Sequence, residues 1–116
     1  FPLIVAVNEH NEVIGYASLS EYRTKEAYRQ TAELSVYIDV NHRGKGVASM
    51  LLESIITLAQ CETDLCTIVS VITSGNNVSR RLHEKYGFEY CGTMRNVGMK
   101  WDKWLGIDNY TLHIQR

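Results

Sequence analysis

The sequence lacks several features that would each mark a class of protein. One proline and eight glycines in 116 residues exclude a collagen-like repeat and the composition of a disordered chain. No apolar run approaches the roughly 20 residues that cross a bilayer, so we expect no membrane partner. Basic and acidic residues nearly cancel, at 12 against 13, which argues against a nucleic-acid partner. The segment Phe1 to Val7 has neither a basic region nor a cleavage site, so no secretory signal is predicted.

Cysteine is also scarce. Cys61, Cys66 and Cys91 form no C-x-x-C pair, and no histidine stands at zinc-ligand spacing from them. The sequence therefore predicts reduced thiols in a cytoplasmic protein and no metal site.

What is present is the composition of an ordinary globular domain, with 45% hydrophobic and 22% charged residues. A chain of this length has room for one hydrophobic core. We therefore expect a single domain over residues 1–116.

The first part of the chain carries strand patterns. Leu3 to Val7 is apolar and β-branched, and Val13 to Ser20 follows a turn, so the two segments predict a hairpin. After a polar stretch, Glu21 to Gln30, apolar and polar residues alternate from Thr31 to Val40. This period of two predicts a half-buried strand.

The remainder mixes helices and strands. Apolar residues at helical spacing predict a helix from Val47 to about residues 61–64. A second helix is predicted over Asn76 to Tyr86, with Gly87 at its end. The other predicted segments are a strand at Thr67 to Ile72, a strand at Phe88 to Thr93, an irregular stretch at Gly98 to Lys103 and a weak strand at Trp104 to Ile114. This order predicts an α+β fold, a mixed sheet with two helices.

One strand-to-helix junction is a candidate anion site. After Val40, the loop that opens the first helix contains Gly44 and Gly46, which alternate with Arg43 and Lys45. The first amides of a helix have no intrahelical acceptor, and the helix dipole adds partial positive charge there. The loop could therefore hold a phosphate. The alternative is that its glycines only turn the chain.

Two nucleotide-binding motifs do not fit this loop. A P-loop needs serine or threonine after its lysine, whereas Gly46 follows Lys45. A dinucleotide-binding loop needs a third glycine where Ser49 stands, and its strand is usually apolar throughout rather than alternating.

The spacing of this loop does resemble a known family. Arg43-x-x-Gly46-x-Ala48 is similar to the pyrophosphate loop of the GNAT superfamily of N-acetyltransferases. The run Asn76-x-x-Ser79-x-x-Leu82-His83-x-x-x-Gly87-Phe88 resembles a later helix of that superfamily. Within it, the phosphinothricin and methionine sulfone acetyltransferase group is the most similar, through residues 32–38, 82–88 and 97–104. Together these motifs cover nearly the whole chain.

The resemblance implies where a cosubstrate would bind. In this family acetyl-CoA lies where two parallel strands splay apart, here the segments Thr31 to Val40 and Thr67 to Ile72. The implied acetyl-CoA contacts lie on one strand edge, the glycine loop and the second helix: Val36, Tyr37, Ile38, Arg43, Gly44, Lys45, Gly46, Val47, Ala48, Asn76 and Ser79. The alternative role of Asn76 and Ser79 is helix capping.

Two residues are candidate catalytic groups. An amine is mostly protonated at neutral pH, so acetyl transfer needs a group that removes a proton. The resemblance places Glu33 beside the wedge and His83 opposite the acetyl group, where an imidazole can act as base or acid. The alternatives are a solvated strand residue for Glu33 and a packed helix histidine for His83.

The polar stretch resembles the family's substrate arm. The resemblance implies that Arg23, Lys25 and Tyr28 face an anionic amino acid, with Tyr37 as a further substrate-side residue. The family usually has arginine at the position of Lys25, and lysine keeps the charge but loses bidentate geometry. The alternative is a solvated loop.

The resemblance implies an acetyl-CoA-dependent N-acetyltransferase acting by direct transfer in a ternary complex. Its substrate would be the amine of a small anionic amino acid of the phosphinothricin, methionine sulfone or methionine sulfoximine type. The alternatives are transfer to another amine, such as a polyamine or a protein N-terminus, and a non-catalytic acyl-CoA-binding domain. The family opens with a strand and two helices that precede the hairpin, so we expect an N-terminally incomplete domain. Homodimers are common in the family, and Trp101 and Trp104 could supply interface area; the alternative is that both are buried in the core.

Overall fold

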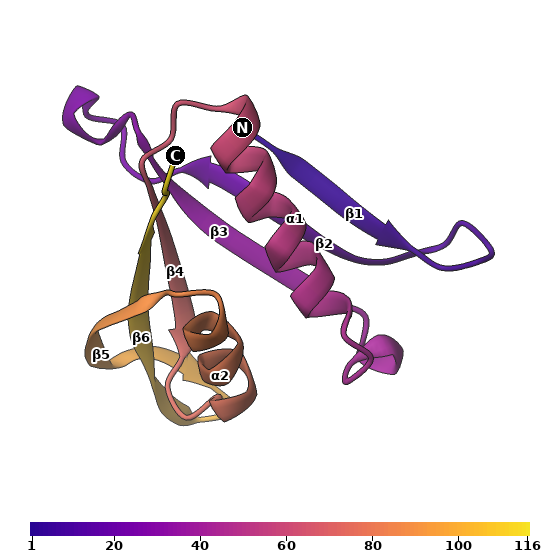
Figure 1. The fold of residues 1–116 in the computed structure, drawn as a ribbon. Helices are drawn as coiled ribbons and strands as arrows, with labels where there is room; N and C mark the ends of the chain where they lie inside the picture. Colours follow the sequence, from indigo (N-terminus) through magenta and orange to yellow (C-terminus); the bar gives the residue numbers. More distant parts are fainter.

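The computed structural model describes all 116 residues. Its elements are β1 Leu3–Val7, β2 Val13–Glu21, the 3₁₀ turn η1 Glu26–Tyr28, β3 Thr31–Ile38, the 3₁₀ turn η2 Val40–His42, α1 Val47–Glu62, β4 Thr67–Thr73, α2 Asn77–Lys85, β5 Glu89–Lys100 and β6 Lys103–His113 (Figure 1). The predicted succession of strands and helices is confirmed. Neither α-helix is long and apolar enough to cross a membrane.

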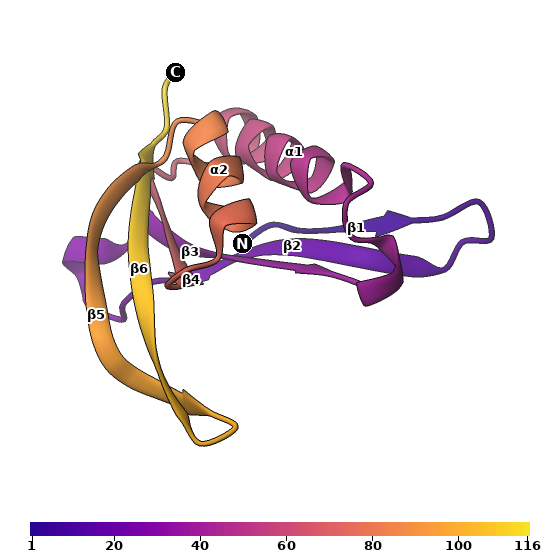
Figure 2. The same ribbon diagram turned by 90° about the horizontal axis from the view of Figure 1, so that it is seen from below.

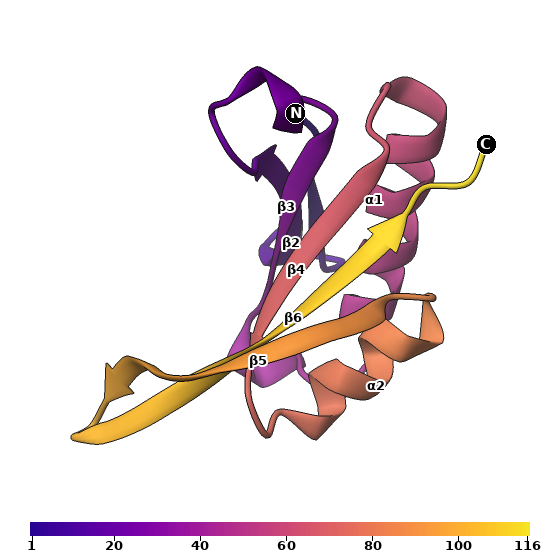
Figure 3. The same cartoon turned by 90° about the vertical axis from the view of Figure 1, so that its left-hand side faces the viewer.

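The strands form one sheet in the order β1-β2-β3-β4-β6-β5. Strands β3 and β4 pair in parallel, and every other neighbouring pair is antiparallel, which confirms the predicted mixed sheet. Both helices lie on the same face of the sheet (Figure 2). The long β5–β6 hairpin reaches out past the rest of the sheet (Figure 3).

Helix α1 packs along the first half of the sheet. Its buried side chains recur at helical spacing and join one core cluster with inward-facing residues such as Ala17 and Leu34. Gly15 allows the close approach, because a β-carbon there would lie 2.8 Å from the carbonyl oxygen of Tyr37 and 3.3 Å from the side chain of Leu51. The buried stripe thus fixes the position of α1, and with it the glycine loop at its start.

Strands β3 and β4 separate part-way along their length. Their parallel pairing runs from Thr31 and Thr67 to Leu34 and Ser70. Strand β3 then continues to Ile38 and β4 continues to Thr73 without pairing to each other. Figure 1 shows the two strands diverging, β3 along α1 and β4 toward α2. The inner backbone edges beyond this point have no ladder partner across the gap.

The structure corrects two predicted boundaries. The strand predicted to reach Val40 ends at Ile38, because Asp39 caps the turn η2 by accepting a hydrogen bond from the backbone N–H of Asn41. The stretch predicted to be irregular, Gly98 to Lys103, mostly belongs to β5 and β6. Its two-residue turn is made by Trp101 and Asp102, both with positive φ, and such hairpin turns are usually marked by Asn-Gly or Asp-Gly.

Candidate active site

The gap between β3 and β4 opens into a cleft of about 270 Å³. The residues that line it come from β3, β4 and α2: Glu33, Leu34, Ser35, Val36, Ser70, Val71, Ile72, Ser79 and His83. Strand pairing therefore brings together two segments that lie more than thirty residues apart in the sequence.

The cleft passes through the sheet. Glu33 and Leu34 are neighbours on β3, so their side chains point to opposite faces. Leu34 belongs to the core beneath α1, which places Glu33 on the face without helices. Ser70 instead points to the helical face, where its hydroxyl meets His83 of α2. The two predicted catalytic residues, Glu33 and His83, thus approach the cleft from opposite sides.

His83 is held in one orientation by two short hydrogen bonds. Its side chain is buried, with 4% of the residue exposed. Nδ1 lies 2.7 Å from the carbonyl oxygen of Ser79, and Nε2 lies 2.7 Å from Oγ of Ser70. Only a ring N–H can bond to a carbonyl oxygen, so the neutral ring carries its proton on Nδ1. Nε2 is therefore an acceptor, and the hydroxyl of Ser70 donates to it.

Burial lowers the pKa of His83 below its ordinary value of 6.5, although the hydrogen bond to Ser79 opposes the shift. The ring packs edge-on against Phe88, with centroids 4.9 Å apart, and lies 5.5 Å from the ring of Tyr110. These apolar surroundings favour the neutral imidazole, the form that can accept a proton. His83 is thus a packed histidine whose neutral ring has an acceptor nitrogen, Nε2.

The glycine loop forms a second polar site, at the start of α1. Gly44 and Gly46 have φ of 77° and 79°, in the left-handed region that glycine adopts without strain. The first intrahelical bond runs from the N–H of Met50 to the carbonyl of Gly46. The N–H groups of residues 47–49 therefore have no acceptor within the helix, and Gly46 supplies no side-chain cap.

Basic side chains surround this helix start. Arg43 donates from Nε to the carbonyl oxygen of Ile38 at 3.3 Å, which ties the loop to the end of β3. Lys45 is exposed beside it. Lys85, at the end of α2, reaches to 3.4 Å from Oγ of Ser49 on the first turn of α1. Free amides, a helix dipole and these cations together favour a bound anion.

Asn76 caps helix α2, as the capping alternative predicts. Its side-chain oxygen accepts a hydrogen bond from the N–H of Ser79 at 3.1 Å. Asn76 keeps its amide NH₂ group for another partner. Val36 lines the cleft, whereas the ring of Tyr37 stacks on Tyr16 at a centroid distance of 5.8 Å. Tyr37 itself is not among the residues that line the cleft.

Comparison with known proteins identifies the fold. The sequence model of the acetyltransferase (GNAT) family matches residues 1–88. The chain belongs to the GNAT acetyltransferase family. A methionine sulfoximine and methionine sulfone acetyltransferase from Pseudomonas aeruginosa is 40% identical over 98% of this chain. A phosphinothricin N-acetyltransferase from Streptomyces coelicolor is 36% identical over 88% of it.

A solved structure agrees with these sequence relatives. The phosphinothricin acetyltransferase of Sinorhizobium meliloti in complex with acetyl-CoA superposes with a TM-score of 0.92 at 33% identity, over 97% of this chain and 60% of that one. The GNAT chain described here spans 66% of the length of the Pseudomonas relative and 59% of the Streptomyces relative.

The predicted substrate arm of this GNAT chain lies outside the cleft. Arg23 and Lys25 are exposed and Tyr28 is 41% exposed, and none of the three lines the cleft. Arg23 lies over the ring of Tyr22, 4.9 Å from its centroid, and Tyr22 packs edge-on against Tyr28. The hydrogen bond with Tyr22 raises the pKa of Arg23, and the charge of Glu33 adds to the effect.

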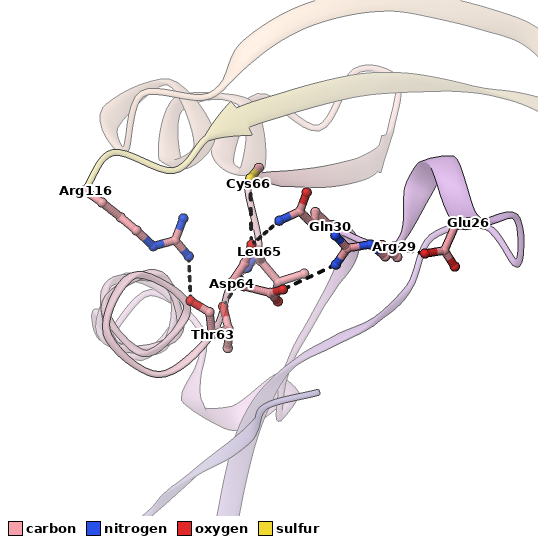
Figure 4. Close-up of polar contacts among 8 residues, drawn as sticks. All are labelled: Glu26, Arg29, Gln30, Thr63, Asp64, Leu65, Cys66 and Arg116. Carbon is pink, nitrogen blue, oxygen red and sulfur yellow. Dashed lines mark hydrogen bonds and ion pairs between the residues drawn. The ribbon is translucent and has the colours of Figure 1, made fainter.

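The C-terminal end of the arm, at Arg29 and Gln30, is hydrogen-bonded to the loop before β4 (Figure 4). Arg29 bridges Glu26 at 3.3 Å and Asp64 at 3.5 Å. Gln30 donates from its side chain to the carbonyl of Asp64, and its own carbonyl accepts from the N–H of Cys66. These bonds fix where the arm leaves the sheet, while Arg23 and Lys25 beyond them are exposed.

Sequence reasoning missed two features of this GNAT site. Ser70 lies within the predicted strand Thr67 to Ile72 but has no predicted role, although a polar residue at an inward strand position is an available signal. The pair of Asp39 and His42, with the carboxylate 2.8 Å from Nδ1, was also missed. That hydrogen bond lowers the pKa of Asp39 and braces the turn before the glycine loop.

Proposed function

We propose that this protein is a single-domain, acetyl-CoA-dependent N-acetyltransferase. It transfers the acetyl group directly to the amine of a small anionic amino acid of the phosphinothricin, methionine sulfone or methionine sulfoximine type. The observation that carries the proposal is the cleft through the sheet, with Glu33 on one side and His83 on the other. Relatives of the same family are named for these substrates, and one of them binds acetyl-CoA.

The residues present fit the proposed cosubstrate. The free amides of Val47, Ala48 and Ser49 suit a diphosphate, with Arg43 and Lys45 beside them and no side chain at Gly44 or Gly46 to obstruct it. The contacts that support a pantetheine arm are the unpaired strand edge and the first turn of α2: Val36, Tyr37, Ile38, Asn76 and Ser79. A strand edge offers such an arm the backbone bonds of an added strand.

Glu33 acts as the base for the amine in this proposal. Its carboxylate lies on the face of the sheet opposite the helices, so an amine can approach it without crossing the cosubstrate site. Removal of one proton from the ammonium group exposes the nitrogen lone pair that attacks the thioester. Backbone N–H groups along the unpaired edge at residues 36–38 polarise the thioester carbonyl.

Arg23, Lys25 and Tyr28 bind the acidic group of the substrate in this proposal. The support is that all three side chains are exposed and that the charge of Glu33 acts on Arg23. Cations at this position favour carboxylate, phosphinate or sulfone oxygens over a cationic polyamine.

We also propose a cytoplasmic homodimer. The three cysteines are unpaired and exposed, as suits a reducing compartment. Exposed apolar side chains gather on the projecting β5–β6 hairpin, namely Met94, Val97, Met99, Trp101 and Trp104. Such a surface is suited to pairing with a second copy.

An acetyl-transfer assay tests the proposed activity. The full-length protein is mixed with acetyl-CoA and with methionine sulfone, phosphinothricin, spermidine or a peptide with a free N-terminus, and release of the CoA thiol is followed. We expect saturable release with the two anionic amino acids. Release with spermidine or the peptide but with neither amino acid would contradict the substrate class. Calorimetric binding of acetyl-CoA with no release for any amine would instead favour an acyl-CoA-binding domain.

A further inference from the structure

Ser70 is a buried hydroxyl at the point where β3 and β4 separate. It stands within the strand sequence Thr-Ile-Val-Ser-Val-Ile-Thr, and 3% of the residue is exposed. It is the last residue of β4 that pairs with β3, so its side chain lies at the vertex of the cleft. A hydroxyl at this position needs a partner, because burying an unbonded one is unfavourable.

The partner of Ser70 determines what the hydroxyl offers to the cleft. Because Nδ1 of His83 donates to the carbonyl of Ser79, the only hydrogen of Ser70 goes to Nε2 of His83. In this state Oγ of Ser70 presents only acceptor lone pairs to the cleft. If Nε2 becomes protonated, the hydrogen bond reverses, and the hydroxyl hydrogen of Ser70 becomes free to donate.

We propose that Ser70 relays protons between His83 and the reacting atoms, carrying one proton from the amine nitrogen to the sulfur of CoA. The proposal rests on the proposed function. After Glu33 has removed the first proton of the ammonium group, attack on the thioester leaves a second surplus proton on nitrogen. Ser70 accepts that proton on Oγ as its own hydrogen passes to Nε2 of His83.

The return step restores the starting state. As the carbon–sulfur bond breaks, Ser70 donates its hydrogen to the departing sulfur and takes the proton back from Nε2. The products are the amide and the CoA thiol, and Ser70 and His83 end as they began. Ser79 stabilises the transient imidazolium, because its carbonyl oxygen is held 2.7 Å from Nδ1.

The groups around His83 keep its ring neutral outside the transfer step. From β6, Tyr110 faces the ring, and burial raises the pKa of its hydroxyl, so it stays neutral. On α2 itself, Arg80 and Glu84 are near Tyr110 and pair with each other at 3.5 Å. From α1 no charged group contacts His83, and Phe88 covers its other side. Glu33 is the remaining titratable group that lines the cleft.

The test compares Ser70→Ala with Ser70→Thr, which keeps the hydroxyl. Ser74→Ala is the matched control, because it removes a bond of the same 2.7 Å length, to Asp108, outside the cleft. We expect Ser70→Ala to lower kcat about 100-fold, the usual scale of acid–base catalysis, and to move the pH profile of kcat. Ser70→Thr should keep kcat within about ten-fold of the wild type. Affinity for acetyl-CoA, measured by calorimetry, should stay unchanged in all three.

Nuclear magnetic resonance gives a readout that needs neither turnover nor a variant. In the ¹⁵N-labelled wild-type protein we expect the neutral ring of His83 to carry its proton on Nδ1. A proton on Nε2 would overturn the relay even if both Ser70 variants fail to fold. Wild-type activity that persists unchanged in Ser70→Ala would overturn the relay and leave the acetyltransferase proposal standing. Absence of turnover in the wild type with every amine would instead reject the proposed function, and the relay with it.

Discussion

The candidate active site has two ends, which are built from different parts of the chain. At the start of α1, backbone groups make the site: two left-handed glycines and the free N–H groups of residues 47–49. Where β3 and β4 separate, side chains make it, because Ser70 and His83 are both almost fully buried and bonded to each other. One end can hold an anion, and the other can move a proton.

This difference has a physical consequence. A site made of amides does not depend on the identity of most side chains, provided that the backbone keeps its path. A site made of buried side chains depends on single atoms, because each buried polar atom has one partner that nothing else replaces. Substitutions at the glycine loop should therefore weaken binding gradually, whereas substitutions near His83 should affect turnover sharply.

The largest effect is expected from Glu33→Gln, which removes the proposed base of the side-chain end and keeps its size. Without the carboxylate the amine stays protonated, so kcat should fall about 100-fold, while the affinity for acetyl-CoA stays unchanged. Stopped-flow release of CoA and calorimetry measure the two quantities. Glu53→Gln, an exposed position on α1, is the control. Full turnover of Glu33→Gln across the pH range would remove Glu33 as the base.

A smaller effect is expected from Gly46→Ala at the backbone end. Alanine at a φ of 79° costs about 1–2 kcal/mol, although a β-carbon there would meet nothing within 4 Å. If the loop shifts to relieve this strain, acetyl-CoA should bind about ten-fold more weakly, with kcat at saturation little changed. Gly92→Ala carries a similar backbone strain on β5, at φ of 123°, and should leave binding intact. A loss of kcat in Gly46→Ala would show that the two ends are not separate.

The same contrast explains what could be predicted from the sequence. The glycine loop and the first turn of α2 are local, so their motifs are visible in consecutive residues, and the structure gives them the expected conformations at Gly46 and Asn76. Partners that come from separate elements are not visible in this way. Ser70 and His83 meet only because β4 carries α2 back over the sheet.

The turn at Trp101 and Asp102 was missed for a different reason. Its residues are not those that usually adopt positive φ, so no local signal marked it, and pairing between β5 and β6 imposes the conformation. The ring of Tyr37 stacks on Tyr16, a contact that depends on the β2–β3 register and that no local pattern predicts. Local conformation was thus predictable, and contacts set by register were not.

A third prediction concerns the burial of His83 and the stability of the fold. Because burial lowers its pKa, the unfolded chain takes up a proton before the folded protein does as the pH falls through 6.5. The free energy of unfolding should therefore be highest above this pH and decrease below it, by at most about 1.4 kcal/mol per pH unit from this group. Urea unfolding between pH 7.5 and 5 measures the slope. His83→Gln should have a shallower slope, and equal slopes would contradict the buried, neutral state.

The smallest effect is expected from Lys25→Ala on the exposed arm, which belongs to neither end of the candidate active site. Lys25 makes no hydrogen bond through its side chain at the start of η1, so its charge acts through water. Exposed charge pairs contribute about 0.2–1 kcal/mol, so KM for an anionic amino acid should rise about two- to five-fold at low salt. Added salt should remove the difference, because it screens the charge. Lys103→Ala, at the far hairpin, should leave KM unchanged. A salt-independent loss in Lys25→Ala would mean that the arm closes over the cleft and that Lys25 is desolvated with the substrate.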